Sequence, residues 1–144
     1  MTHINFYVSN QNGFEHRMHI AYRLIAHALK RKLFIHIHTD NERMSKQVDE
    51  RLWTFDKKSF IPHCIVDASA NEARSNETIT ISHEYEPVAN CDYLINLSSQ
   101  RPGFFSRFTK LAEILDSSDE ILAAGRKRYV FYRERGYTLD YYKL

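Results

Sequence analysis

The densest group of residues that could bind a ligand lies near the C-terminal end, where basic and aromatic side chains alternate between residues 125 and 137. A helical period would place Arg126, Tyr129 and Arg133 on one stripe, at i, i+3 and i+7. A neighbouring stripe would contain Arg128, Phe131, Tyr132 and Arg135. Arginine beside tyrosine offers a bidentate clamp for an anion next to an apolar wall. Such a site suits an acidic peptide with an aromatic residue, or a chain-terminal carboxylate.

Two other interpretations of this stretch stay open. Interleaved basic and aromatic side chains could stack on single-stranded nucleic acid. Alternatively, the helix could pack its aromatic residues into the core and leave its arginines solvated. The chain has 20 basic and 18 acidic residues, a formal charge of +2, whereas dedicated nucleic-acid binders usually have a stronger basic bias. Any anion binding must therefore depend on local clustering of cations.

Phosphate-binding loops are rich in glycine, because backbone N–H groups must approach the phosphate closely at a helix N-terminus. The chain has four glycines, and none belongs to a GxGxxG or GxxxxGK[ST] pattern. The first loop between a strand and a helix reads SNQNGF. We therefore expect no nucleotide cofactor.

The eight histidines raise the question of a metal site. His36 and His38 would share one face of a strand. His16 and His19 lie three residues apart on an expected helix. A zinc site needs a third or fourth ligand, which could come from His63, His83 or Cys64. Scattered histidines on amphipathic elements are more often half-buried or surface groups, so we expect no metal.

Catalytic patterns are equally weak. There is no GxSxG motif, and adjacent residues such as His63 and Cys64 point to opposite faces of an extended chain. An acidic cluster lies where we expect one helix to follow another; its members are Glu113, Asp116, Asp119 and Glu120. The last two suit the positive end of the final helix. The sequence thus favours a non-catalytic protein, and an enzyme is the least favoured class.

The cysteines and the chain ends indicate the compartment. Cys64 and Cys91 form no CxxC pair, and we interpret them as buried core residues of a reduced protein. The N-terminus, MTHINFYVSN, lacks the basic and apolar regions of a signal peptide. No window approaches the ~18 consecutive apolar residues of a transmembrane helix. We expect a soluble cytoplasmic protein without a membrane partner.

Strand and helix patterns alternate along the chain. Strands are predicted at residues 4–8, 33–38, 78–82 and 92–97, with a short extended segment at 60–66. Helices are predicted at residues 14–32, from 39–41 to about 53, 104–115 and 119–135, with Gly136 closing the last one. A polar surface loop is predicted at residues 67–77.

Strands separated by helices imply parallel crossovers, so we predict a layered α/β domain with helices on both faces of a mostly parallel sheet. No helix is predicted between the third and fourth strands. We therefore expect at least one antiparallel pairing in a mixed sheet. A length of 144 residues fits a single domain, residues 1–144.

Several motifs, taken in order, resemble one family. Arg51-Leu52-Trp53 followed by Ser59-Phe60-Ile61-Pro62-His63 resembles the LW…SF(V/I)PH signature of the bacterial DNA polymerase III chi subunit family. Residues 126–137 are similar to that family's RxRYxxYRxxGF/Y pattern. The opening strand with Phe6-Tyr7, the strand at 93–97 and the total length also match. The resemblance covers nearly the whole chain.

The resemblance implies a non-catalytic, Rossmann-like protein that binds no cofactor. Family members bridge the clamp loader, through a small partner called psi, to single-stranded DNA-binding protein (SSB), and so touch DNA only indirectly. They grip the acidic SSB tail, which ends in an apolar residue and a free carboxylate. A location in the bacterial cytoplasm, at the replication fork, follows. The alternative from the residues alone is a stand-alone single-stranded nucleic-acid-binding protein that uses the last helix.

Site residues carry over from the family motifs. The SSB-tail pocket would include Arg126 as partner of the terminal carboxylate, Tyr129, and Leu115 from the preceding helix. Lys127 or Arg128 would attract the acidic residues of the tail at longer range. The psi surface would include Trp53, Phe60 and Ile61. The sequence departs from the pattern just after Tyr129, where Val130 stands in place of an expected lysine.

Overall fold

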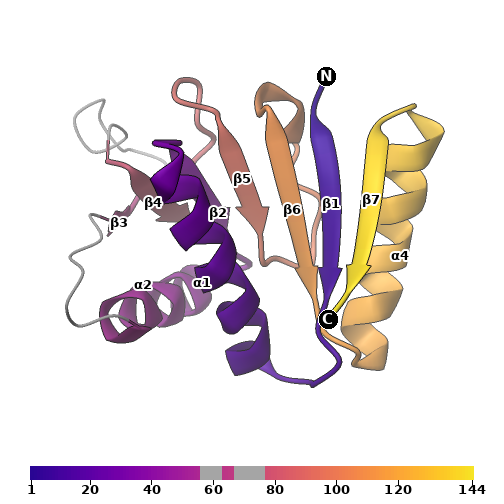
Figure 1. Cartoon of the computed structure of the whole chain (residues 1–144), viewed down its shortest axis with the longest axis horizontal. Helices are drawn as coiled ribbons and strands as arrows, with labels where there is room; N and C mark the ends of the chain where they lie inside the picture. Colours follow the sequence, from indigo (N-terminus) through magenta and orange to yellow (C-terminus); the bar gives the residue numbers. More distant parts are fainter. Residues whose placement is uncertain (56–62, 67–76) are drawn as a thin grey trace.

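The computed structural model describes residues 1–55, 63–66 and 77–144, which form a parallel β-sheet with helices on both faces (Figure 1). The seven strands run in the spatial order β3-β4-β2-β5-β6-β1-β7. They are β1 (His3–Val8), β2 (Ile35–His38), β3 (His63–Ile65), β4 (Ile79–Ser82), β5 (Tyr93–Asn96), β6 (Lys110–Leu115) and β7 (Thr138–Lys143). The helices are α1 (Phe14–Lys30), α2 (Glu42–Phe55), the 3-10 helix η1 (Phe105–Arg107) and α4 (Asp119–Glu134). The predicted α/β fold is confirmed.

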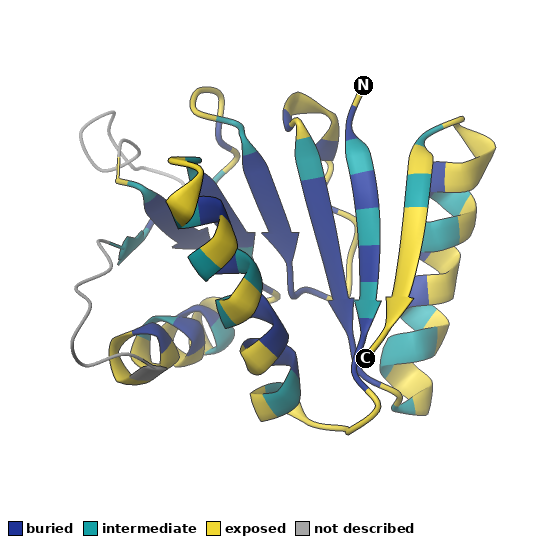
Figure 2. Ribbon diagram, viewed as in Figure 1, coloured by how far each residue is buried: buried dark blue, intermediate teal, exposed yellow. Residues whose placement is uncertain are grey.

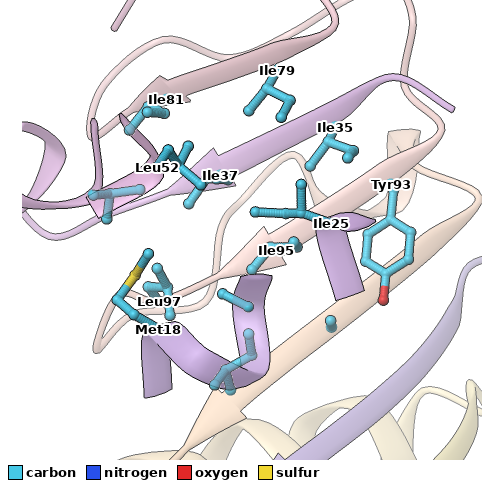
Figure 3. Packing of buried hydrophobic residues seen from close by; sticks show 14 of the residues in the cluster. Met18, Ile25, Ile35, Ile37, Leu52, Ile79, Ile81, Tyr93, Ile95 and Leu97 are labelled. Carbon is cyan, nitrogen blue, oxygen red and sulfur yellow. The ribbon is translucent and has the colours of Figure 1, made fainter. Parts of the chain in front are cut away.

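Each face of the sheet has its own core. On one face, α1 and α2 cover the strands from β4 to β6, where Met18 and Ile25 of α1 pack against strand isoleucines (Figure 3). On the other face, α4 and the segment around η1 bury aromatic rings, among them Phe104, Phe105 and Tyr132. β4 and β5 are buried at every residue (Figure 2). A parallel sheet covered on both faces requires such continuously buried strands.

The ends of the helices follow the predicted capping residues. The side-chain Oδ1 of Asn41 accepts a hydrogen bond from the backbone N–H of Met44 at 2.9 Å, so Asn41 caps α2. Gly136 has a φ of 81°, the left-handed conformation that glycine adopts easily after a helix. The last helix therefore ends where the sequence predicts. No helix in the described ranges is long and apolar enough to cross a membrane.

The expected antiparallel pairing is wrong, because every strand pairing among the described residues is parallel. β4 and β5 both pair with β2, one on each side, rather than with each other. The segment between them, residues 83–92, contains no helix, yet it returns the chain to the other end of the sheet. A segment without a helix thus makes the crossover between two parallel strands that a helix makes in a standard βαβ unit.

The predicted helix over residues 104–115 is also wrong. The structure has the short η1 there, followed by β6, which lies between β5 and β1. Residues 111–115 are all buried, because this central strand is covered on both faces. Phe104, Phe108, Leu111 and Leu115 match a helical period, but the two phenylalanines belong to the η1 segment and the two leucines to the strand.

The edge strand β7 was not predicted at all. It pairs in parallel with β1, from His3 opposite Thr138 to Val8 opposite Lys143. Most of its residues are exposed, so it lacks the apolar run of the inner strands. The prediction that both cysteines are buried is wrong as well, since Cys64 and Cys91 are half-buried thiols. The predicted loop at 67–77 lies outside the described residues except for Glu77.

Candidate functional site

A pocket of about 170 Å³ opens between α4 and the strands β6, β1 and β7. The residues that line it are Phe6, Leu115, Leu122, Gly125, Arg126, Tyr129 and Tyr141. Arg126 is the one charged residue of this set, and the rest give an apolar lining. We call this site the α4 pocket. It can accept an apolar side chain and place an anion beside it.

The floor of the α4 pocket depends on a close approach between α4 and β6. Gly125 is buried, and a Cβ at this position would overlap Leu115 Cδ1 and lie 3.0 Å from Leu115 Cδ2. The absence of a side chain therefore lets the helix lie directly on the end of the strand. As a consequence, Leu115 lies in the same pocket as three residues of α4, namely Leu122, Arg126 and Tyr129.

Three aromatic rings from different elements form one wall. The ring of Tyr129 on α4 lies 5.3 Å from that of Phe6 on β1, with an interplanar angle of 65°. It lies 6.4 Å from the ring of Tyr141 on β7, at 85°. Edge-to-face contacts of this kind fix the orientation of the rings. The wall is thus held in place before any ligand arrives.

Arg126 supplies the charge of the α4 pocket. Its side chain is exposed, and no ion pair in the described part of the chain involves it. A guanidinium in this situation can form two parallel hydrogen bonds to a carboxylate. The geometry therefore suits a ligand that carries an apolar group and a carboxylate next to each other.

A buried polar network sets the position of α4. Glu113 of β6 is fully buried, and an oxygen of its carboxylate lies 3.1 Å from Arg128 Nε. The hydroxyl of Tyr132 donates to the same carboxylate at 2.7 Å, and Asn96 Nδ2 donates to it at 2.8 Å. Burial, and then the charge of Glu113, raises the pKa of Tyr132, so this hydroxyl stays a donor. The network ties α4 to β5 and β6.

This network changes the interpretation of Arg128. Arg128 is only 6% exposed, and its charge is paired with Glu113. Lys127 is exposed, so of the two cations predicted to attract a tail at long range only Lys127 presents its charge to solvent. The interpretation of α4 as a helix with merely solvated arginines is therefore wrong for Arg128. Val130 is exposed beside the α4 pocket without lining it.

The origin of Leu115 also differs from the prediction. Leu115 is the last residue of strand β6, not part of a helix. Its backbone carbonyl accepts a hydrogen bond from Ser9 N at 2.9 Å, at the point where β6 and β1 end together. The side chain still reaches the α4 pocket, so the structure brings Leu115, Arg126 and Tyr129 together as the sequence predicts.

The chain matches a known protein family over nearly its whole length. The family model described as "DNA polymerase III chi subunit, HolC" matches residues 1–140. The chain belongs to the DNA polymerase III chi subunit family. It therefore has an accessory role in DNA replication, as a subunit of the polymerase that is not itself catalytic, and its partners lie within the polymerase complex.

Relatives in the chi family align over most of this chain. DNA polymerase III subunit chi of Pseudomonas aeruginosa is 31% identical over 144 residues, which cover 100% of this chain and 98% of that protein. The subunit of Haemophilus influenzae is 28% identical over 136 residues, 94% of this chain and 92% of its own length. That of Escherichia coli K12 is 26% identical over 102 residues, 70% and 67% of the two chains.

The second predicted surface lies at the end of α2. Trp53 is 49% exposed, and its ring lies 4.5 Å from that of His63. Nε2 of His63 lies 3.1 Å from Asp49 Oδ1. The other two residues predicted for this surface, Phe60 and Ile61, lie outside the described residues. Trp53 is therefore on the surface.

Some of the histidines and acidic residues that were considered as metal ligands or catalytic groups make structural contacts instead. Nδ1 of His36 lies 2.6 Å from Thr80 Oγ1, and the rings of Tyr85, Phe104 and Phe108 surround this histidine. Burial, and then the neighbouring His38, lowers the pKa of His36 to about 3. The acidic cluster lies between a strand and a helix rather than between two helices. Glu113 belongs to the buried network, and Asp116 accepts a hydrogen bond from Gly13 N at 2.9 Å.

Four lining residues were missed from the sequence, namely Phe6, Leu122, Gly125 and Tyr141. Leu122 lies four residues before Arg126 and seven before Tyr129, so the helical stripe already contained the signal. Tyr141 belongs to β7, whose sequence TLDYYK is rich in β-formers and directly follows the closing glycine. Phe6 was recognised only as part of the first strand.

Proposed function

We propose that this chain links DNA polymerase III to SSB by holding the acidic C-terminal tail of SSB in the α4 pocket. The observation that carries the proposal is the position of Arg126, an exposed cation without an ion pair among the described residues, at the rim of an apolar pocket. The tail ends in an apolar residue with a free carboxylate, as the family resemblance implies. That pair of groups matches the pair of features in the pocket.

The bound tail would be arranged by these features. Its last side chain enters the pocket against Leu115 and the wall formed by the rings of Phe6, Tyr129 and Tyr141. Its terminal carboxylate pairs with Arg126, whose two N–H groups fit the two oxygens. Acidic residues further up the tail lie over the solvent side of α4, where Lys127 attracts them at longer range.

The proposal is tested by fluorescence anisotropy with a labelled SSB C-terminal peptide. We expect wild-type protein to bind in the micromolar range, about −8 kcal/mol. Arg126→Ala, or amidation of the peptide carboxylate, should weaken binding about tenfold or more, because a charge-assisted pair is lost. Arg43→Ala is the matched control, because it removes an exposed cation from α2. No binding by wild type, or equal losses in both variants, would refute the proposal.

We propose in addition that the psi subunit binds at the end of α2, on a surface that includes Trp53, Phe60 and Ile61. The exposure of Trp53 supports this, since an exposed tryptophan is a common anchor of interfaces. Trp53→Ala should lower the affinity for purified psi by about 2 kcal/mol or more, measured by calorimetry. The affinity for the SSB peptide should not change. A variant that keeps full affinity for psi would remove this site from the proposal.

A further inference from the structure

A second cationic site lies along α4, on the flank that faces the loop after β5. It is a groove of about 590 Å³ that shares no lining residue with the α4 pocket. Its lining residues are Ser99, Gln100, Arg101, Glu120, Ala123, Ala124 and Lys127. Lys127, Phe131 and Arg135 fall at i, i+4 and i+8 along this flank, so the basic–aromatic pattern of α4 divides into two separate stripes.

Two arginines are held around one ring next to this groove. The guanidinium carbon of Arg101 lies 3.6 Å from the centroid of the Phe131 ring, and that of Arg135 lies 4.2 Å from it. The two guanidinium groups are therefore within about 8 Å of each other. Within residues 1–55, 63–66 and 77–144, neither arginine has an acidic partner closer than 4.0 Å. Such a pair of like charges favours binding of an external anion.

The loop that carries Arg101 is fixed on both sides. Ser99 donates from its backbone N and its Oγ to Asp40 Oδ1, at 2.8 and 2.9 Å. Arg128 Nη1 donates to the carbonyl of Ser99 at 3.0 Å, and Asn96 Nδ2 donates to that of Gln100 at 3.0 Å. The position of Arg101 relative to α4 is thus set without a ligand. A site organised in advance loses little conformational entropy on binding.

We propose that Arg101 and Lys127, which line the groove, and Arg135, which shares the Phe131 ring with Arg101, contact the phosphate backbone of single-stranded nucleic acid; we call these three residues the cation groove. The guanidinium carbons of Arg101 and Arg135 both lie over the Phe131 ring, and the N–H groups of these side chains are the parts that pair with phosphate oxygens. Two such groups, held close together, can bind successive phosphates of one strand. The groove is also larger than the α4 pocket, as a sugar–phosphate backbone requires and the last side chain of a peptide does not.

The test is anisotropy of labelled oligothymidylate at low salt, repeated over a series of salt concentrations. Wild-type protein should bind, and the double variant Arg101→Gln/Arg135→Gln should bind about tenfold more weakly. The slope of log K against log[salt] should fall by about 1.4, since each phosphate contact on a single strand contributes about 0.7. Controls are Arg31→Gln/Arg43→Gln, two exposed cations elsewhere, and Arg126→Ala in the α4 pocket. Thermal unfolding should show that all three proteins are folded at the temperature of the assay, and both controls should keep their DNA binding.

Two results would overturn the inference. In the first, wild-type protein does not bind the oligonucleotide at low salt; if an oligoglutamate peptide then binds to wild type but not to the groove variant, the groove belongs to acidic peptides. In the second, the groove variant keeps both the affinity and the salt slope of the wild type. Loss of SSB-peptide binding in Arg126→Ala tests the α4 pocket separately. Each proposal can therefore fail without the other.

Discussion

The same strands present different chemistry to the two faces of the sheet. Toward α1 and α2, the strands β2, β4 and β5 contribute Ile35, Ile37, Ile79, Ile81 and Ile95. Their alternate residues point to the face of α4 and η1, and these are His36, His38, Thr80, Ser82, Leu94 and Asn96. β6 continues the difference, with Ala112 and Ile114 toward one face and Glu113, between Leu111 and Leu115, toward the other.

The difference shows how the fold separates stability from positioning. Aliphatic packing, which is non-directional, dominates the α1/α2 face, where Arg17 of α1 also donates to the carbonyls of Leu97 and Ile114. The Glu113 network is directional, because each hydrogen bond fixes a distance and an angle between α4 and the sheet. Both proposed anion sites use α4, and both therefore depend on this orientation. The face that holds the Glu113 network is where a precise helix position matters.

The largest effect should come from breaking the buried network. Glu113→Ala leaves the guanidinium of Arg128 and the hydroxyl of Tyr132 buried without the carboxylate they share. Removing one partner of a buried pair typically costs about 3–5 kcal/mol. We expect the free energy of unfolding in urea to fall by that amount, and affinity for the SSB peptide to fall in protein that remains folded at low temperature.

Ile37→Ala on the opposite face is the matched comparison. It removes a fully buried side chain, and we expect a loss of about 2–5 kcal/mol from lost packing and the cavity. Because no directional contact to α4 is lost, peptide affinity of the folded protein should stay the same. A Glu113→Ala protein that lost less than about 1 kcal/mol, or an Ile37→Ala protein with weakened peptide binding, would contradict the proposed division between the faces.

Acid should destabilise the protein through the α4 face. His36 stays neutral in the folded state down to about pH 3, whereas in the unfolded chain it takes up a proton near its ordinary pKa of about 6.5. Below that pH the unfolded state binds the additional proton, so the free energy of unfolding falls as pH falls. The slope from this residue should approach 1.4 kcal/mol per pH unit, about 2 kcal/mol between pH 6.5 and 5. Urea unfolding over this range measures it.

The matched variant is His36→Leu/Thr80→Val, which replaces both partners of the buried hydrogen bond by apolar groups. It should keep most of its stability at pH 7 and lose the steeper part of the pH dependence. The smaller contribution of His38, whose pKa burial also lowers, should remain. Equal slopes in the wild type and the double variant would show that His36 does not stay neutral in the folded protein.

The sequence predicted most of the fold where hydrophobic period and element type agree. β1, α1, α2 and α4 fall in this class, and the Asn41 cap and the Gly136 stop mark their ends. The segment 104–115 failed because a central strand is apolar on both faces, and apolar residues three or four apart then also match a helix. The expected antiparallel pairing failed for a different reason, since a crossover without a helix leaves no periodic signal.

The sequence predicts those site residues that lie together on one helix. Arg126 and Tyr129 share a stripe of α4, and their motif shows the family. Tyr141 and Phe6 reach the α4 pocket through strand pairing, which no local pattern encodes. Arg128 was misjudged because its partner, Glu113, lies 15 residues away on β6. Arg101 was not considered, since only the fold brings it to Phe131.

The smallest expected effect is a change in SSB-peptide affinity when one charge is added to the α4 face. Val130 is 39% exposed and stands where the family resemblance leads us to expect a lysine. Val130→Lys should add a cation near the α4 pocket without altering the packing of its lining. We expect affinity for the SSB peptide to rise about twofold to threefold, mainly through faster association, because a charge at the rim of an interface acts at long range. Stopped-flow anisotropy at two salt concentrations separates the association rate from the dissociation rate.

Gln47→Lys is the matched control, because it adds the same charge to an exposed position of α2 on the opposite face. Screening at 0.15 M salt limits exposed charges to a range of about 8 Å, so this lysine should leave the association rate unchanged. If both variants accelerate binding equally, the net charge of the molecule attracts the tail. If neither does, the tail is held by the α4 pocket and Arg126 with no help from charge along the rest of the helix. Only a gain confined to Val130→Lys fits an α4 face whose local cations guide its ligands.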